Sequence, residues 1–240
     1  MVQHAIVAKN ISKSFANKKV LKDVSFTVEK KPGIFGLIGL NGIGKTTFIK
    51  TMLGLLRPDE GDIKVMGHAP EKLEAKSQLA YLPEKLSPSP FLTGEEFLSL
   101  AVSMHGKQYN AEKAKKIAME LDFDHNALQI QAGKYSKGMG QKLGLISVFM
   151  VDAQLLILDE PMSGLDPRAR IFLKKKMASY VKEGNTIFLS SHILSDVEEI
   201  CNEMTIMHNG EIKYLGNVKD ALKKHNSKNL EEAFLKFIES

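Results

Sequence analysis

The stretch that decides the fold is Gly-Leu-Asn-Gly-Ile-Gly-Lys-Thr, residues 39–46, which follows the apolar segment 33–38. Its spacing, a glycine, four variable residues and then Gly-Lys-Thr, is that of a phosphate-binding P-loop. Glycines let the backbone curl until successive N–H groups point at phosphate oxygens, and the positive end of the following helix adds to the attraction. The surrounding patterns predict a strand over 33–38 and a helix over 45–55, which is the context that the motif requires.

This loop predicts a site for ATP and Mg²⁺. Lys45 is expected to reach the β- and γ-phosphates as a catalytic cation, and the Thr46 hydroxyl is expected to bind Mg²⁺. The alternative is a glycine-rich turn that binds no nucleotide. The residues expected to contact the nucleotide here are Gly39, Asn41, Gly42, Gly44, Lys45, Thr46 and Thr47.

A second motif, Leu-Leu-Ile-Leu-Asp-Glu, occupies residues 155–160. It reads as a buried strand that delivers two acids at its carboxyl end, where open α/β sheets bind ligands. Asp159 is placed to hold Mg²⁺, and Glu160 is placed to polarise the attacking water as a catalytic base. Many apolar strands end in acids by coincidence, so the motif is weak alone, but together with the P-loop it is strong.

The rest of the chain alternates between strand and helix patterns, except in its middle, where the apolar spacing is helical from about residue 86 to 151. Helices are expected over 167–182 and 193–201. Strands are expected over 4–10, 20–29, 62–66, 78–82, 155–158 and 186–190, with a hairpin of 204–208 and 211–215. This order predicts the α/β class: a P-loop NTPase core with a mostly parallel sheet, an N-terminal antiparallel β part and an inserted all-helical subdomain.

We expect a single domain over residues 1–240. Its core covers about 1–85 and 152–216, the helical subdomain about 86–151, and a helical tail about 217–240. One face of the tail is apolar and is expected to pack on the domain itself, with a partner contact as the alternative. That face comprises Leu230, Ala233, Phe234, Phe237 and Ile238.

Composition narrows the class of protein. No stretch approaches the ~20 apolar residues of a membrane helix, and residues 1–10 lack the pattern of a signal peptide. The single cysteine, Cys201, is incompatible with an internal disulfide and is expected to be a buried small apolar residue. The net charge of +5 comes without an arginine-rich run or aromatic–basic interleaving, so no nucleic-acid partner is expected.

Further motifs, taken in order, make the chain resemble the nucleotide-binding subunit of ATP-binding cassette (ABC) transporters along essentially its whole length. The matching segments are Phe15, the P-loop, 81–84, 135–139, 159–161, 163–166 and His192. The signature Leu-Ser-Gly-Gly-Gln of that family reads Tyr-Ser-Lys-Gly-Met here, which keeps Ser136 and Gly138. The resemblance implies that these two residues face the γ-phosphate held by the other cassette of a head-to-tail dimer; on the residues alone, Ser136 is a helix N-cap.

The same resemblance gives roles to four more residues, each with a structural alternative. Glu84 stands where the family usually has a glutamine that touches Mg²⁺; alternatively it is a solvated charge. Asp166 would cross the dimer, or cap a helix beside Pro167. His192 would contact the γ-phosphate and help to position water, although a lone histidine is usually structural. Phe15 would stack on adenine, or belong to the core.

The resemblance thus implies an ATPase that drives a transmembrane permease subunit on a separate chain. Two cassettes, either identical or related, would enclose two ATP molecules, with the helical subdomain as the platform for the permease. The cassette would be cytoplasmic and peripheral, held on the inner face of the cell membrane by that partner. The residues of these motifs are similar to those of prokaryotic cassettes that serve multidrug, antibiotic or bacteriocin-immunity exporters, so export is expected. The cargo is chosen by the membrane chain.

Three alternatives compete with this interpretation. A cassette ATPase of translation usually carries two cassettes, and a repair type carries a long coiled coil; the 240 residues show neither. A P-loop kinase or GTPase would not be expected to carry the signature, Asp166 and His192 in this order. A catalytically silent partner of an active cassette is disfavoured by intact Lys45, Glu160 and His192.

Overall fold

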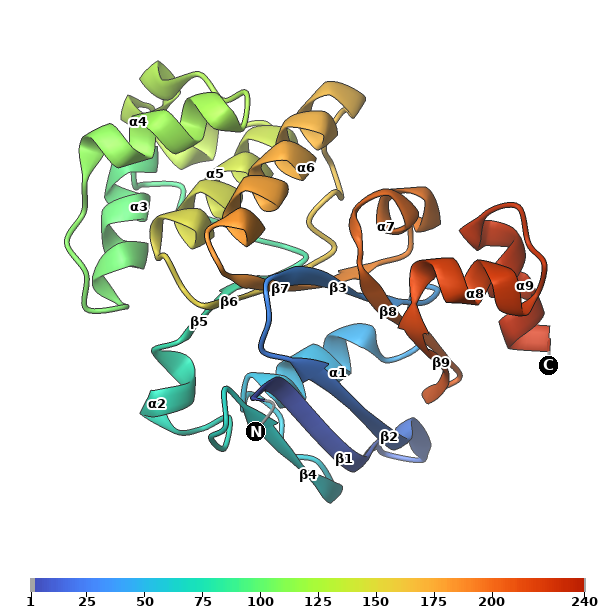
Figure 1. The fold of residues 1–240 in the computed structure, drawn as a ribbon. Helices are drawn as coiled ribbons and strands as arrows, with labels where there is room; N and C mark the ends of the chain where they lie inside the picture. Colours follow the sequence, from blue (N-terminus) through green and yellow to red (C-terminus); the bar gives the residue numbers. More distant parts are fainter. Residues whose placement is uncertain (1–2, 240) are drawn as a thin grey trace.

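The computed structural model describes residues 3–239 and contains two sheets with helices between and around them (Figure 1). The strands are β1 (His4–Phe15), β2 (Lys18–Glu29), β3 (Gly33–Ile38), β4 (Glu60–Val65), β5 (Leu79–Leu82), β6 (Leu155–Asp159), β7 (Thr186–Ser191), β8 (Glu203–His208) and β9 (Glu211–Asn217). The α-helices are α1 (Lys45–Met52), α2 (Leu73–Lys76), α3 (Gly94–Ser103), α4 (Ala111–Glu120), α5 (Lys137–Met150), α6 (Pro167–Lys182), α7 (Leu194–Ile200), α8 (Val218–Lys224) and α9 (Leu230–Glu239).

The larger sheet has the strand order β5-β6-β7-β3-β8-β9, and only β9 runs antiparallel to its neighbour. The smaller sheet has the order β2-β1-β4 and is antiparallel throughout. This confirms the predicted α/β class, with its mostly parallel sheet and its antiparallel N-terminal part.

The strand order brings three motif-bearing loops together. Strand β7 pairs with β6 on one side and with β3 on the other, so Ser190 lies opposite Asp159 and Ser191 lies opposite Ile38. Because the strands are parallel, all three carboxyl ends meet at one edge of the sheet, which is where open α/β sheets bind ligands. The loop after β3, the Asp-Glu pair of β6 and the residues after β7 therefore become neighbours.

A phenylalanine cluster joins the two sheets. The ring of Phe35 on β3 lies 5.7 Å from Phe26 on β2 and 5.6 Å from Phe188 on β7, both stacked. Phe48 of α1 tilts against Phe26 at a centroid distance of 5.0 Å. Each buried ring of this size stabilises the fold by about 1.5–3 kcal/mol, so the cluster fixes α1 against the large sheet.

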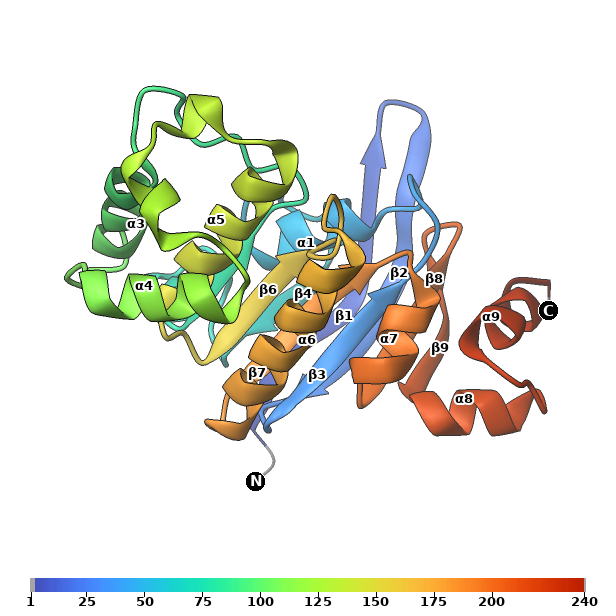
Figure 2. The same cartoon turned by 90° about the horizontal axis from the view of Figure 1, so that it is seen from above.

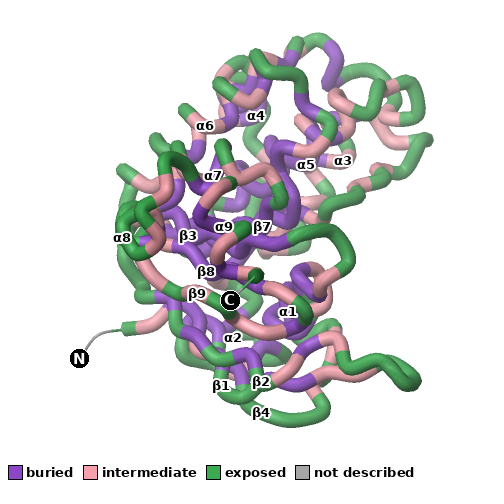
Figure 3. The backbone as a smooth tube through the Cα atoms, turned by 90° about the vertical axis from the view of Figure 1, so that its right-hand side faces the viewer, coloured by how far each residue is buried: buried purple, intermediate pink, exposed green. Residues whose placement is uncertain are grey.

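The opposite face of the large sheet is covered by helices α5, α6 and α7, while α3 and α4 stand to one side (Figures 1 and 2). Figure 3 shows buried backbone running through β3, β7 and β8, with exposed connections at the periphery. In the tail, four residues of the predicted apolar face of α9 are buried in the core beneath these helices, and Ile238 packs against it: Leu230, Ala233, Phe234 and Phe237 are at most 4% exposed. The backbone N–H of Leu230 also donates to Glu198 of α7 at 2.7 Å, so the expectation that the tail packs on the domain is confirmed.

Several element boundaries differ from the predicted ones. Strand β1 continues to Phe15 through an irregularity at Asn10, whose φ of 54° interrupts the alternation of side chains. Helix α1 ends at Met52, because Gly54 adopts a φ of 68°. The helical middle also contains two 3-10 helices, His125–Gln129 and Ala132–Lys134.

Two further features concern short helices. The four-residue α2 was not predicted, because a single turn shows no apolar period. The predicted helical tail consists of two helices, α8 and α9, joined by residues 225–229. The predicted domain spans residues 1–240, and the predicted tail ends at residue 240. Residues 1–2 and 240 lie outside the described part of the chain. Across residues 3–239, no helix combines the length and apolarity that crossing a bilayer would take.

Candidate nucleotide site

The loop from β3 to α1 requires its glycines for geometric reasons. Gly42 and Gly44 have φ angles of 79° and 115°, in the region that side chains disfavour, and Gly44 is the N-cap of α1. A Cβ on Gly39 would lie 2.0 Å from Cδ1 of Ile43 and 2.6 Å from the carbonyl oxygen of Met207. The sequence pattern thus corresponds to a tight backbone turn at the N-terminus of a helix.

Lys45 points back into this loop. Its ammonium donates to the carbonyl oxygens of Gly39 at 2.7 Å and Leu40 at 3.2 Å. It also lies 3.1 Å from Oε1 of Glu160, and both side chains are nearly buried. The structure therefore brings together the predicted phosphate-binding lysine and the predicted catalytic base.

Asp159 is completely buried at the end of β6. Its Oδ1 accepts a hydrogen bond from the Ser190 hydroxyl at 2.5 Å, whereas no hydrogen bond to Oδ2 is found in the described residues. Burial raises the pKa of the Asp159 carboxyl, while hydrogen bonds from Ser190 and Thr46 act to lower it. Oδ2 is thus a buried carboxylate oxygen that accepts no hydrogen bond from residues 3–239, and it lies close to a threonine hydroxyl. Oxygen atoms of these two kinds are the ligands that Mg²⁺ prefers.

Glu160 and His192 form a second contact of the site. Oε2 of Glu160 lies 2.8 Å from Nδ1 of His192 and also accepts the backbone N–H of His192 at 3.3 Å. Because the ionised carboxylate has no proton to give, the imidazole Nδ1 must be the donor. Glu160 itself has a φ of 50°, a strained conformation of the kind that collects at functional sites.

Ser190 was not among the predicted site residues. Its hydroxyl donates to Asp159 and accepts the backbone N–H of Glu160 at 3.0 Å, so it holds both acids. The signal in the sequence is the run Ser190-Ser191-His192 at the end of a predicted strand, but the partner strand cannot be identified from that run alone.

Most of the predicted P-loop residues line a cavity of about 400 Å³ together with Glu160, whereas Gly39, Asp159 and His192 are not among its lining residues. Its lining residues are Val20, Asn41, Gly42, Gly44, Lys45, Thr46, Thr47, Glu84 and Glu160. Val20 is a lining residue that the sequence did not indicate. Glu84 is exposed and faces the cavity, where its charge acts to raise the pKa of Asp159. Phe15 is not a lining residue, and because its side chain is 45% exposed at the end of β1, the alternative that it belongs to the core is wrong.

The predicted signature residues line a different cavity, of about 270 Å³, with no lining residue in common with the first. Ser136 caps α5 and accepts the N–H of Met139 at 3.2 Å. Asp166 caps α6 and accepts the N–H of Ala169 at 2.9 Å, a bond that lowers the pKa of Asp166. Both capping roles are therefore present, and Ser136, Gly138 and Asp166 share one surface of the molecule.

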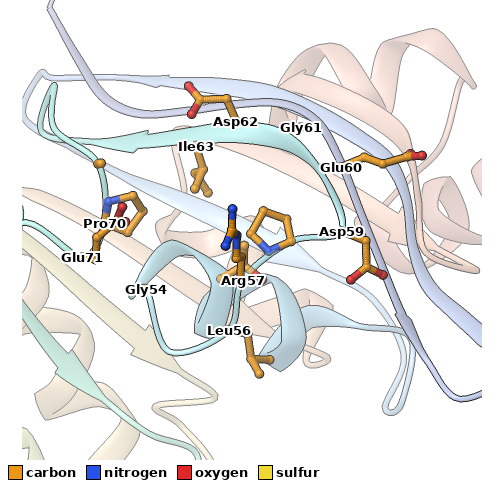
Figure 4. Close-up of a pocket in the computed structure, with 13 residues that line it drawn as sticks. Gly54, Leu56, Arg57, Asp59, Glu60, Gly61, Asp62, Ile63, Pro70 and Glu71 are labelled. Atoms are coloured by element: carbon orange, nitrogen blue, oxygen red, sulfur yellow. The ribbon is translucent and has the colours of Figure 1, made fainter.

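A larger cavity of about 680 Å³ lies elsewhere, between the end of α1, β4 and residues 69–71 (Figure 4). It is charged: its lining contains Arg57 and four acidic residues, Asp59, Glu60, Asp62 and Glu71. Asp59 at its rim is already paired with Lys13 at 2.7 Å. The cavity shares no residue with the P-loop or the signature, so its size does not make it part of the nucleotide site.

Comparison with known proteins agrees with this geometry. The family model described as ABC transporter matches residues 21–163. An uncharacterized ABC transporter ATP-binding protein from Nostoc sp. is 38% identical over 217 residues, which cover 88% of this chain and 64% of that protein, so the chain spans less than two thirds of this relative. The linearmycin resistance ATP-binding protein LnrL of Bacillus subtilis is 32% identical over 219 residues, covering 89% and 69% of the two chains.

A solved structure described as the ATP-binding subunit of an ABC transporter superposes with a TM-score of 0.89 at 32% identity, covering 97% of this chain and 99% of that one. The family match covers more than half of the described chain, and it includes both the P-loop and the Asp159–Glu160 pair. The chain therefore belongs to the ABC transporter family, as one of its ATP-binding cassettes.

Proposed function

We propose that this chain is the ATP-hydrolysing motor of an ABC transporter, which closes as a dimer on two ATP molecules with Mg²⁺ and drives a separate transmembrane chain. One observation carries the proposal. Lys45, Glu160 and His192 form a continuous series of contacts, of 3.1 and 2.8 Å, at the mouth of the P-loop. A lysine for phosphate, a carboxylate for water and a histidine that orients the carboxylate are what phosphoryl transfer to water requires.

The two oxygens of Glu160 suggest how hydrolysis proceeds. ATP binds with its phosphates on the N–H groups of residues 39–47 and the N-terminus of α1. Lys45 then exchanges the Glu160 carboxylate for phosphate oxygens, which frees Oε1. His192 retains Oε2 through its Nδ1–H and so fixes the carboxylate plane. Oε1 is left to accept the proton of the water that attacks the γ-phosphate, and His192 would also help to position that water.

Mg²⁺ is the metal that such a site would take, and the residues fit it. Thr46, the free Oδ2 of Asp159 and Glu84 would hold the ion. When bound, the ion would neutralise charge on the β- and γ-phosphates. Glu84 brings a negative charge where a neutral amide is usual in the family, so two acids, Glu84 and Glu160, line the cavity together with the buried Lys45.

The dimer is proposed because one chain holds two halves of a site that do not meet. Ser136, Gly138 and Asp166 line their own cavity, away from the P-loop residues. A second cassette, either a copy of this chain or a related one, would set these residues against the γ-phosphate when packed head to tail. Hydrolysis would then depend on closure of the dimer, because each site needs both chains.

The transmembrane partner would dock on the helical subdomain, for which we propose residues of about 86–151, between core segments of about 1–85 and 152–216. Helix α3 in that region exposes Leu100 and is followed by the exposed Met104. The partner would hold the cassette at the cytoplasmic face of the membrane. Export is the proposed direction, supported by the relative that is named for linearmycin resistance.

Purified protein tests the motor directly. The wild-type chain is expected to hydrolyse ATP with Mg²⁺ and to lose this activity with EDTA. Glu160→Gln is expected to abolish turnover and to accumulate as a dimer only with ATP, as measured by light scattering. If neither nucleotide binding nor hydrolysis is found, alone or after co-expression with a membrane partner, the motor proposal is wrong.

A further inference from the structure

Arg170 contacts two segments that each follow a residue of the catalytic pair. It lies one turn into α6, and its Nε donates to the carbonyl oxygen of Leu165 at 3.2 Å. Its Nη1 lies 3.6 Å from Oδ2 of Asp196. Leu165 belongs to residues 161–166, which continue directly from Glu160, and Asp196 belongs to α7, which begins two residues after His192. One guanidinium thus joins the chain after Glu160 to the chain after His192.

Asp196 is an unusual partner, because its carboxylate is almost completely buried. Oδ1 is paired with Lys174 at 2.8 Å, but no hydrogen bond to Oδ2 is found in the described residues. The 3.6 Å separation from Arg170 is too long for a hydrogen bond. A movement of a few tenths of an ångström between α6 and α7, which lie side by side in Figures 1 and 2, would bring the two atoms within hydrogen-bond distance.

We infer that Arg170 is a positioning residue for hydrolysis, which ties residues 161–166 to α7 and thereby sets the contact between Glu160 and His192. The inference rests on the proposed function, because Asp166, next to Leu165, is expected to meet the second cassette. The two segments are joined twice, at Glu160–His192 and at Leu165–Arg170–Asp196. Segments tied at two points move together, so closure at Asp166 is carried to the carboxylate that activates water.

The plainer alternative is that Arg170 only fastens α6 to α7. Lys174 provides a matched control for that alternative. It pairs with Asp196 and with Glu199, both on α7, but in the described part of the chain it forms no hydrogen bond or ion pair with residues 161–166. Either Arg170→Ala or Lys174→Ala removes one cation from Asp196, whereas only Arg170→Ala releases the carbonyl of Leu165.

The two variants are compared in the full chain by urea unfolding, ATP binding, steady-state hydrolysis and, with Glu160→Gln added, ATP-dependent dimerisation. We expect similar shifts of the unfolding midpoint in both. Arg170→Ala should lower kcat at least about tenfold with little change in KM, because misplacement of a catalytic group by a fraction of an ångström is costly. Lys174→Ala should keep kcat within about twofold. Arg170→Lys should not rescue kcat, because a compact ammonium cannot make both contacts in the planar geometry of a guanidinium.

The imidazole signals of His192 in NMR spectra give a readout that needs no hydrolysis. The chemical shifts of these signals should change in the Arg170→Ala variant and stay as in the wild type in the Lys174→Ala variant. Equal effects of the two variants on kcat and on His192 would overturn the inference and leave Arg170 as a fastening between helices. If the wild-type chain neither binds nor hydrolyses ATP, the proposed function fails, while the comparison of His192 signals still decides whether Arg170 positions it.

Discussion

Gly39 shows how a single residue determines the shape of the nucleotide site. A methyl group there would collide with Ile43 and with the backbone of Met207, at 2.0 and 2.6 Å. We expect Gly39→Ala to lower the free energy of unfolding by about 1–3 kcal/mol, the usual cost of overpacking, and to weaken ATP binding. Urea denaturation and a fluorescent ATP analogue would measure the two effects.

Gly42 supplies the comparison for that variant. Its φ is positive, unlike that of Gly39, but nothing lies within 4 Å of an added Cβ. Gly42→Ala should therefore cost only about 1 kcal/mol, from the left-handed backbone conformation. An equal loss in both variants would contradict the view that steric contact at Gly39, rather than backbone strain in the loop, makes glycine necessary.

Cys201 is a residue for which burial predicts low reactivity. The thiol is free and buried, and desolvation raises its pKa above the ordinary value, so the thiolate is disfavoured. The native protein should react with Ellman's reagent far more slowly than the same protein in guanidinium chloride. Fast labelling without denaturant would show that this part of the structure, beside Gly36 and Val197, opens readily.

At the scale of elements, the start of α5 combines a cap with a proposed phosphate contact. Ser136→Ala removes the acceptor for the N–H of Met139 and should cost about 1 kcal/mol of stability, the usual value for an N-cap. Ser136→Asn keeps a capping oxygen and should restore most of that stability. If the hydroxyl also serves the second cassette, neither variant will recover ATP-dependent dimerisation in the Glu160→Gln background.

Helix α9 allows a direct test of how the tail is held. Phe234 is 4% exposed and lies in the main core, so Phe234→Ala should lower the free energy of unfolding by about 3–5 kcal/mol. Its neighbour Leu235 is 53% exposed, so Leu235→Ala should be nearly neutral in the same denaturation experiment. A small effect at Phe234 would mean that the tail contributes little to the stability of the domain.

The elements also show where sequence reasoning stops. The P-loop and the Asp-Glu strand were predictable, because the residue types are tied to their chemistry and lie next to each other in the chain. The pairing of β7 between β6 and β3 was not, and it is this pairing that places Ser190 and His192 beside the acids. Likewise, Phe15 could not be placed, because the irregularity at Asn10 hides the continuation of β1.

At the scale of the whole molecule, the P-loop cavity and the signature cavity are separate surfaces, and most residues that line the second cavity belong to the helical region. Arg170 and Asp196 join α6 to α7, and Glu198 joins α7 to the tail. The Nε2 of Gln141, on α5, donates to the carbonyl of Pro161, next to Glu160, at 3.2 Å. Movement of the helical region is therefore expected to reach the catalytic carboxylate through α5 as well as through α6.

The helical region presents the surface where a membrane partner is expected. Leu100 and Met104 are one helical turn apart, on or just past α3, and are 52% and 79% exposed. Isolated exposed apolar residues are common, but two on the same face suit the groove or helix of a partner. The double variant Leu100→Glu and Met104→Glu should leave the folding and ATP binding of the isolated chain unchanged.

That variant should, however, no longer co-purify with its transmembrane chain after co-expression, because two buried charges without partners are costly at an interface. Met119→Glu, at a methionine on α4 that is 64% exposed, tests whether any added charge has this effect. Loss of the partner with both variants would indicate a general charge effect, and retention with both would place the docking surface elsewhere. Loss of the partner with the α3 double variant alone would identify the exposed apolar turn as the docking surface. From there movement can reach the catalytic carboxylate, because α3 packs against α5 and Gln141 of α5 donates to the carbonyl of Pro161.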